Sequence, residues 1–134
     1  MKLGRYKELI KFWKSIEGMC VNDDDKYSRL KLFLKRNPKL NFMVLYNNEI
    51  IGTIKSSHDG RRGYLHHLAV KKEYRKTGIA KILIQMCLRK LRMVGISKFR
   101  VFVLDSNKKA IQFWKHMGFS LQVYDYRTLE INEK

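Results

Sequence analysis

The sequence predicts one α/β domain over residues 1–134, in the α+β arrangement of a mixed sheet flanked by helices, antiparallel in its first half and with a parallel central pair. Three observations predict this fold class. Apolar residues recur at helical spacing before Pro38, strand-like runs separated by turn residues fill residues 41–70, and helix and strand patterns alternate after residue 78. A chain of 134 residues suits a single core.

Two helices are expected first. Within residues 5–18, six apolar side chains recur every few positions: Tyr6, Leu9, Ile10, Phe12, Trp13 and Ile16. Residues 22–25 then offer capping groups for a second helix, which must end near Asn37 because a residue before proline avoids the helical region. Only residues 1–4 precede the first helix, so a strand before it would be very short or missing.

Three antiparallel strands are expected next. Residues 41–46 and 49–54 are apolar runs joined by Asn47 and Asn48, which is typical of a hairpin. A second turn at residues 58–60 leads into a strand over residues 63–70, so the chain should cross the sheet three times in alternating directions.

The second half should alternate helix and strand. The strongest helical pattern covers residues 78–94, and Gly95 is expected to end it. Its inward face is expected to hold Ile79, Leu83, Met86, Cys87 and Leu91. A strand over residues 98–104, joined to its predecessor by a helix, should lie parallel to it; a helix over residues 107–117 and a strand over residues 119–129 should follow.

Composition excludes several classes of protein. Hydrophobic residues make up 45% of the chain, too many for a disordered protein, while no apolar run is long enough for a membrane span and the start lacks a signal-peptide pattern. We therefore expect a cytoplasmic protein without a membrane partner. The two cysteines, Cys20 and Cys87, have no CxxC spacing and no histidine cluster beside them, so no disulfide framework or metal site is expected.

The net charge is strongly positive. Lys and Arg number 29 against 12 Asp and Glu, giving +17, a charge that attracts nucleic acid, anionic membranes and phosphorylated cofactors alike. A lysine-rich composition without functional meaning explains it as well. The basic residues are scattered along the chain, so a disordered nucleic-acid-binding tail is not indicated.

A phosphate-binding loop is the main functional candidate. A strand, a basic loop and a helix follow one another here, and the loop runs through Arg75, Lys76, Thr77, Gly78, Ile79 and Ala80. Unpaired amides and the dipole at a helix start favour a pyrophosphate, and a glycine lets its oxygens approach the backbone. A solvated loop would show the same residues. The P-loop pattern for nucleotides is absent.

Three segments together resemble the GNAT superfamily of N-acetyltransferases. They are LHHLAV at residues 65–70, YRKTGIA at residues 74–80 and NKKAIQFWKHMGF at residues 107–119, and the resemblance covers nearly the whole chain. The turn DGRRG at residues 59–63 is similar to small bacterial acetyltransferases of the YpeA type. The resemblance implies acetyl-CoA as acyl donor, an amine as acceptor and no metal.

The resemblance also implies residue roles. The strand ending at Val70 should splay from its parallel neighbour, so that Leu68, Ala69 and Val70 bind the pantetheine arm through main-chain groups. The 75–80 loop should hold the pyrophosphate. Asn107, at the start of the later helix, matches the family's asparagine beside the cofactor, and it also suits a plain helix cap.

His66 is the candidate general base. Acyl transfer to an amine requires a deprotonated amine, a polarised thioester carbonyl and a protonated leaving thiolate; an amide near Val70 is the candidate for the second task. Period-two alternation predicts that Tyr64, His66 and Leu68 share one strand face and that His67 lies on the other. A structural, hydrogen-bonded histidine is the alternative.

Trp114 departs from the family pattern. Many GNAT enzymes have tyrosine at this position, and its hydroxyl can protonate the thiolate, whereas an indole cannot. Water, another tyrosine such as Tyr124 or Tyr126, or a proton released by the amine would then protonate the thiolate, while Trp114 packs against the cofactor arm.

Two functions follow from these residues. The first is an acetyl-CoA-dependent N-acetyltransferase whose acceptor is not polycationic, because the +17 charge would repel polyamines. The second is a catalytically degenerate module that binds acyl-CoA or nucleic acid; the chain has no RNA-binding or DNA-reading motif, which disfavours nucleic acid. The sequence leaves the acceptor, the acyl group and the oligomeric state, including a homodimer, open.

Overall fold

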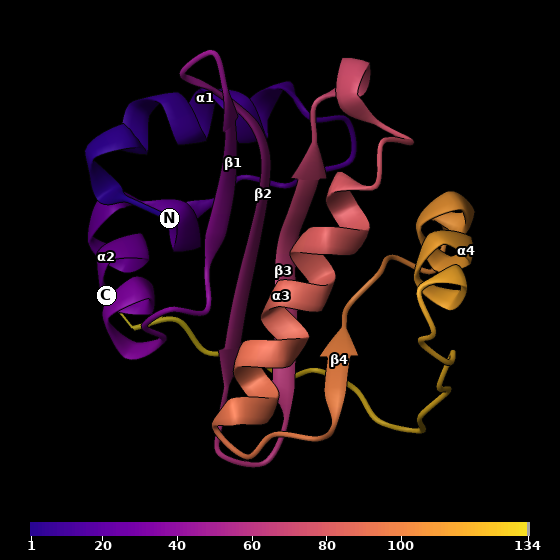
Figure 1. Ribbon diagram of the computed structural model, residues 1–134. Helices are drawn as coiled ribbons and strands as arrows, with labels where there is room; N and C mark the ends of the chain where they lie inside the picture. Colours follow the sequence, from indigo (N-terminus) through magenta and orange to yellow (C-terminus); the bar gives the residue numbers. More distant parts are fainter. Residues whose placement is uncertain (134) are drawn as a thin grey trace. The chain divides into compact units, whose positions relative to one another are not determined.

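A computed structural model describes residues 1–133 of the chain (Figure 1). These residues belong to two compact units, Met1–Phe102 and Val103–Lys134. The first unit contains all the strands that the described residues form, together with helices α1 to α3, and the second contains helix α4. Within residues 1–133 no helix is long and apolar enough to span a membrane.

The two helices predicted before Pro38 are confirmed. They are α1 (Tyr6–Ser15) and α2 (Tyr27–Arg36), preceded by short 3-10 turns η1 (Leu3–Arg5) and η2 (Asp23–Asp25). Helix α1 places Leu9, Phe12 and Trp13 in the core, and α2 adds Leu30. The sequence leaves a first strand either very short or missing, and within residues 1–133 no strand precedes α1.

The sheet has the predicted antiparallel first half. In the described part of the chain it has four strands in the order β1-β2-β3-β4: Phe42–Tyr46, Glu49–His58, Gly63–Val70 and Phe99–Val101. Strands β1, β2 and β3 pair antiparallel, and β3 and β4 pair parallel. Asn47 and Asn48 both have positive φ, 48° and 64°, the backbone that a tight hairpin turn requires and that asparagine tolerates.

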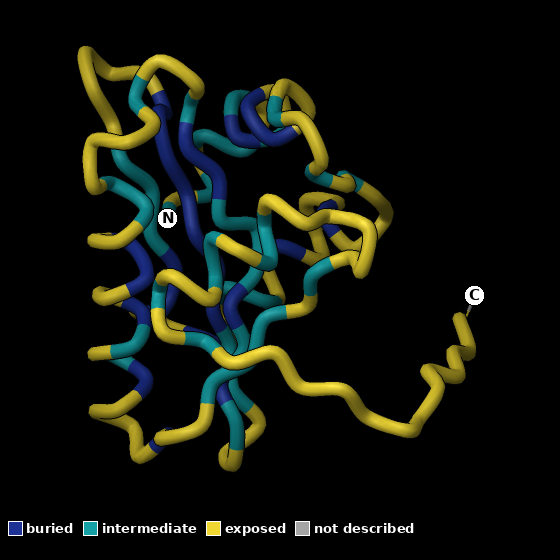
Figure 2. Tube along the Cα trace, turned by 90° about the vertical axis from the view of Figure 1, so that its right-hand side faces the viewer, coloured by how far each residue is buried: buried dark blue, intermediate teal, exposed yellow. Residues whose placement is uncertain are grey.

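The strand predicted over residues 119–129 is wrong. Residues 119–133 form no helix or strand in the structure, and their apolar side chains from Leu121 onward are exposed, with Val123 at 90% and Leu129 at 94% (Figure 2). Alternating residues suit a strand only where another strand offers hydrogen-bonding groups. The parallel pair is consequently at the edge of the described sheet rather than central, and β4 covers only Phe99–Val101 of the predicted 98–104.

Helix α3 (Ile79–Met93) lies on the opposite face of the sheet from α1. A Cβ on Gly52 would lie 3.5 Å from Leu83 of α3, whereas the next residue, Thr53, accepts a hydrogen bond from Trp13 of α1. The buried residues of α3 are Leu83, Ile84, Cys87 and Leu91. The prediction that Met86 faces inward is wrong, since it is 38% exposed and Ile84 is buried instead.

The second unit contains helix α4 (Lys108–His116) and the residues around it. The predicted helix is confirmed, and Gly118, with φ 98°, follows its last residues. Three aromatic rings pack together here: Trp114 lies 5.3 Å from Phe113 and 5.0 Å from Phe119, centre to centre, in edge-on geometry.

Candidate functional site

The loop before α3 is exposed and held by its own chain. After a 3-10 turn at Lys72–Tyr74, the side chain of Arg75 donates from Nε to the carbonyl oxygen of Val70 at 3.1 Å. The hydroxyl of Thr77 donates to the carbonyl oxygen of Tyr74. These two bonds fix the loop as it leaves β3, and the second explains why a threonine stands in a loop whose other polar residues are basic.

The amino terminus of α3 is open. Gly78 is its N-cap, with φ 89°, and a Cβ built on it would meet no described heavy atom within 4 Å. The first helical bond runs from Ile82 N to Gly78 O, and in the described chain the first turn has neither an acidic residue nor a side-chain cap. Its amide groups therefore lack intrahelical acceptors, which is the arrangement that suits an anion.

Strand β3 loses its parallel partner halfway along. The β3–β4 pairing covers Gly63 to Leu65, opposite Phe99 to Val101. Residues 66–70 of β3 have no partner on β4 within the described chain, although they continue to pair with β2 through Val70. Leu68, Ala69 and Val70, which the resemblance predicts to bind the pantetheine arm, lie on this part of β3. An extended ligand with amide groups can pair with such an edge as an added strand.

A β-bulge interrupts β3 at the same place. Thr53 pairs with Ala69 and Lys55 with His66, so His67 and Leu68 together lie opposite Ile54. His67 has φ 48°, a left-handed conformation that costs a residue with a Cβ about 1–2 kcal/mol. We refer to His67 and Leu68 below as the bulge.

The bulge overturns the predicted alternation of faces. His66 contacts the ring of Phe33 from α2, and His67 contacts the ring of Trp13 from α1. Ala69 belongs to the same core cluster as Trp13. The two histidines therefore lie on the same side of the sheet, because the extra residue in β3 shifts the alternation by one position.

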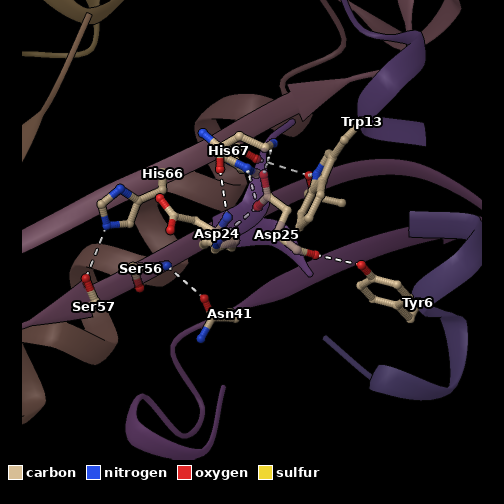
Figure 3. A network of polar contacts seen from close by, with 12 residues as sticks. Tyr6, Trp13, Asp24, Asp25, Asn41, Ser56, Ser57, His66 and His67 are labelled. Carbon is tan, nitrogen blue, oxygen red and sulfur yellow. Dashed lines mark hydrogen bonds and ion pairs between the residues drawn. The ribbon is translucent and has the colours of Figure 1, made fainter. Parts of the chain in front are cut away.

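His66 is a partly buried, neutral imidazole. Its Nε2 lies 3.2 Å from the hydroxyl oxygen of Ser57 (Figure 3). Its ring is stacked with that of Tyr64, with the ring centres 6.3 Å apart. Burial, with the positive charges of Lys55 and His67, lowers the pKa of His66 to about 4. At pH 7 the ring can accept a proton, but it is a weak base.

Asp25, Lys55 and His67 form a buried charged group that we call the Asp25 cluster. The carboxylate Oδ1 of Asp25 lies 2.8 Å from His67 Nε2 and 3.7 Å from Lys55 Nζ, and Oδ2 accepts from the amide of Asn22 (Figure 3). Asp25 is only 2% exposed. A carboxylate only accepts hydrogen bonds, so His67 donates from Nε2.

For both Asp25 and Lys55, burial shifts the pKa in one direction and the neighbouring charges shift it in the other. Burial raises the pKa of Asp25, but the hydrogen bond and charge of His67, the Asn22 amide and the charge of Lys55 outweigh it, leaving that pKa below its ordinary value. Burial lowers the pKa of Lys55, and Asp25 compensates only in part. The Lys55 ammonium also lies 4.5 Å from the centre of the Phe33 ring, a favourable cation–π contact.

Sequence reasoning missed Asp25 and Lys55. Residues 22–25 were interpreted as capping groups, and they do form a capping box on η2, in which the Asn22 side chain accepts from the amide of Asp24. Two signals were present: a run of three carboxylates in a chain of charge +17, and a lysine directly after the apolar stretch of β2. The lysine after this apolar stretch suggests a partner of opposite sign, whereas the acidic run does not single out Asp25, because Asp23 and Asp24 are exposed.

Asn107 and Trp114 lie in the second unit. The side-chain oxygen of Asn107 accepts from the amide of Ala110 at 3.1 Å, so the predicted helix-capping role is confirmed. Trp114 packs between Phe113 and Phe119 of the same unit. Their predicted roles at the donor stay predictions.

The chain is similar in sequence to known acetyltransferases. The model of the acetyltransferase (GNAT) family matches residues 6–119. An acetyltransferase of Yersinia pestis (strain Pestoides F) is 26% identical over 117 residues, which cover 87% of this chain and 82% of that protein.

Solved structures share the fold. An aminoglycoside 6′-N-acetyltransferase from Acinetobacter haemolyticus has a TM-score of 0.79 at 14% identity, covering 98% of this chain and 97% of that one. Arabidopsis thaliana Naa50, in complex with a bisubstrate analogue of CoA and a peptide, has a TM-score of 0.74 at 20% identity, covering 92% of this chain and 82% of that one. With its family model matched over residues 6–119, this chain belongs to the acetyltransferase (GNAT) family.

Proposed function

We propose that this protein is an N-acetyltransferase that moves the acetyl group of acetyl-CoA to a primary amine of a small molecule or protein, by direct attack of the amine on the thioester. One observation carries the proposal: the open amino terminus of α3 follows directly on the β3 edge that β4 has left. An anion and an extended amide-containing arm can then be bound by adjacent main-chain groups. Acetyl-CoA has both features.

The donor is held by two groups of residues. Amides of Gly78, Ile79 and Ala80 bind the pyrophosphate, with Arg75, Lys76 and Thr77 around them, and Leu68, Ala69 and Val70 bind the pantetheine arm. Arg75 is already bonded to Val70 O, so its charge supports the loop while the backbone makes the closest contacts. Asn107 and Trp114 are also proposed as donor-binding residues, on the family resemblance of residues 107–119. The family model spans both units, which supports one domain over residues 1–134.

His66 is the proposed general base, directly or through water. Its imidazole is neutral at pH 7 because its pKa is about 4. So weak a base does not deprotonate a resting ammonium ion efficiently. It accepts a proton once the amine nitrogen has begun to bond to the carbonyl carbon, because the N–H groups are then more acidic. The amine must therefore arrive unprotonated.

The acceptor is proposed to be neutral, zwitterionic or anionic, or an amine on a larger acidic partner. The net charge of +17 repels a polycation and favours an anionic donor. The aminoglycoside 6′-N-acetyltransferase and Naa50 are only 14% and 20% identical to this chain, so they show a shared fold and do not indicate its acceptor. The proposed acceptor class is therefore inferred from charge. A cytoplasmic location, where acetyl-CoA is available, fits this function.

A degenerate acyl-CoA-binding module is the second candidate. The observation that favours it is Trp114, which lacks the ionisable hydroxyl of the tyrosine found in many family members. A module of this kind would bind acetyl-CoA with the same loop and release no CoA.

The decisive experiment follows CoA release with acetyl-CoA over a panel of neutral amino acids, acidic peptides, polyamines and aminoglycosides. Turnover with neutral or acidic acceptors is expected. Preferred turnover with polyamines or aminoglycosides would contradict the acceptor class, and donor binding without turnover on any acceptor would support the second candidate.

Gly78→Asp tests the donor site, with Gly95→Asp as a matched control. Both glycines have positive φ, 89° and 92°, and a Cβ on either would meet no described atom within 4 Å, so the backbone strain of the two substitutions is alike. Only Gly78→Asp puts a carboxylate at the helix start, where it repels pyrophosphate. Acetyl-CoA affinity measured by calorimetry should fall at least tenfold in Gly78→Asp alone. Unchanged acetyl-CoA affinity in Gly78→Asp would contradict the assignment of this loop as the donor site.

A further inference from the structure

The bulge at His67 lies where β3 leaves β4. The last β3 residue paired with β4 is Leu65, and the bulge begins two positions later. A bulge bends the strand that contains it and increases its local twist. The backbone conformation of His67 is therefore the local cause of the direction that β3 takes beyond its partner.

That conformation is uncommon for a residue with a Cβ. A φ of 48° is readily adopted by glycine, and asparagine, aspartate and histidine adopt it more often than other residues do, but it still costs energy that contacts around His67 can offset. Local sequence offers no such help, because His67 stands in the middle of a strand and is not at a turn.

Neighbouring residues bond to both the side chain and the backbone carbonyl of His67. Its side chain donates from Nε2 to Asp25 Oδ1 at 2.8 Å, and its backbone carbonyl accepts from the hydroxyl of Thr53 at 3.1 Å. Thr53 accepts in turn from the indole N–H of Trp13 at 2.9 Å, and the His67 ring packs edge-on against that indole at 4.6 Å. Trp13 and Thr53 are completely buried.

Asp25 is itself fixed from several directions. Its Oδ2 accepts from Asn22 N at 3.2 Å, its backbone carbonyl accepts from the hydroxyl of Tyr6 at 2.7 Å, and Lys55 lies beside its Oδ1 (Figure 3). The carboxylate is thus held by the α1–α2 segment and by Lys55 of β2, and among the described residues its hydrogen bond to β3 is the one with His67.

We propose that Asp25 is a positioning residue for donor binding: by holding the His67 side chain, it keeps the bulge in the left-handed conformation that turns β3 away from β4 and exposes the edge for the pantetheine arm. The proposal rests on the proposed function, since it assigns Asp25 to the donor site described above. It couples the α1–α2 segment to acetyl-CoA affinity without any contact between Asp25 and the donor.

Substitutions at His67 separate the side-chain tether from the backbone conformation. His67→Ala removes the tether and keeps a Cβ that disfavours positive φ, whereas His67→Gly removes the tether and adopts positive φ freely. His67→Asn also tolerates it. Asp25→Ala combined with Lys55→Met removes the anchor without leaving a buried, unpaired ammonium group.

The experiment measures acetyl-CoA affinity by calorimetry, kcat at saturating donor, and thermal unfolding for these variants. His67→Ala and the double variant should bind acetyl-CoA about tenfold more weakly, while His67→Gly and His67→Asn stay within about threefold of the wild type. At saturating donor, kcat should change less than threefold in all four. Should His67→Ala fail to fold, the acetyl-CoA affinity of His67→Gly is compared with that of the double variant, which tests the same point.

Two results would overturn the proposal. One is donor affinity in His67→Gly as weak as in His67→Ala; the other is unchanged affinity throughout with a loss confined to kcat, which would make His67 a reacting group. Gly78→Asp, measured in parallel, separates this failure from that of the proposed function. If Gly78→Asp weakens binding while the His67 series does not, the donor site stands and only the role of Asp25 is wrong.

Discussion

The imidazole Nε2 of His67 lies 2.8 Å from the carboxylate Oδ1 of Asp25, a residue 42 positions earlier in the chain. This contact joins the turn before α2 to the middle of β3, and it is almost completely buried on the Asp25 side. Because Lys55 shares the same carboxylate oxygen, the three side chains stabilise the fold as one unit. Their removal, singly or in pairs, therefore gives testable effects on stability.

Asp25→Ala should lower the free energy of unfolding at pH 7 by about 3 kcal/mol, because it leaves the ammonium group of Lys55 buried without its carboxylate. Urea denaturation followed by circular dichroism measures the change. Asp24→Ala is the matched control, since the neighbouring side chain is exposed, and it should change stability by less than about 0.5 kcal/mol. Equal effects of the two substitutions would contradict the assignment of Asp25 as the anchor.

The stability difference between wild type and Asp25→Ala should depend on pH in the acid range. The pKa of Asp25 is lowered in the folded state, so the stability it contributes is complete above its unfolded pKa and is lost as pH falls through the folded value. The difference in unfolding free energy between wild type and Asp25→Ala should therefore be constant from pH 7 to about 5 and shrink below about pH 4. If the difference in unfolding free energy were undiminished at pH 2 to 3, the negative charge of Asp25 would not be the source of its contribution to stability.

Lys55→Met should remove an alkaline gain in stability. Burial lowers the pKa of Lys55, so between its folded and unfolded values the unfolded chain binds more protons, and the folded state gains stability as pH rises. Wild type should gain stability relative to Lys55→Met as pH rises toward the unfolded lysine pKa of about 10. Urea midpoints at three pH values measure this, and parallel pH dependences in the two proteins would show that Lys55 keeps an ordinary pKa.

His66→Ala should lower kcat about 100-fold if His66 is the base, with His58→Ala as the control histidine at the far end of β2. Since the pKa of His66 is about 4, the ring stays neutral from pH 6 to 8, and the wild-type rate should show no inflection near 6.5 from this group. The rate over that range should follow deprotonation of the acceptor amine. Near wild-type activity with an unchanged pH profile in His66→Ala would end the proposal.

Trp114→Tyr should raise kcat, with Trp114→Phe as the control that lacks a hydroxyl. Both substitutions keep an aromatic ring between Phe113 and Phe119, so α4 should remain folded and the thermal midpoint should fall by only a few degrees. Only the tyrosine adds a group able to protonate a thiolate. Equal kcat values for the two variants would show that thiolate protonation does not limit the rate.

Local features were predictable from sequence because their causes are local. The helical spacing of α1 and α3, the asparagine turn between β1 and β2, and the glycine before α3 each depend on residues within a few positions. The 75–80 loop was predicted for the same reason: an uncapped helix start after a strand needs only its own residues to have unpaired amides.

Long-range features were not predictable in the same way. Period-two alternation placed His66 and His67 on opposite faces, yet one extra residue in β3 put both on the side of α1 and α2. The same alternation predicted a strand over residues 119–129, where no described strand pairs with it. Alternation states how side chains would point in a strand, but whether the strand pairs, and in which register, depends on distant residues.

Residue patterns alone are enough to predict the mixed α/β fold, an anion-binding loop at residues 75–80 and the capping role of Asn107, because backbone conformation and unpaired amides at a helix start arise within one segment. The tertiary structure decided that Asp25, Lys55 and His67 share a buried site and that β3 departs from β4 at a bulge. Burial makes charges dependent on their partners, and those partners come from three separate segments of the chain, so only folding brings them together.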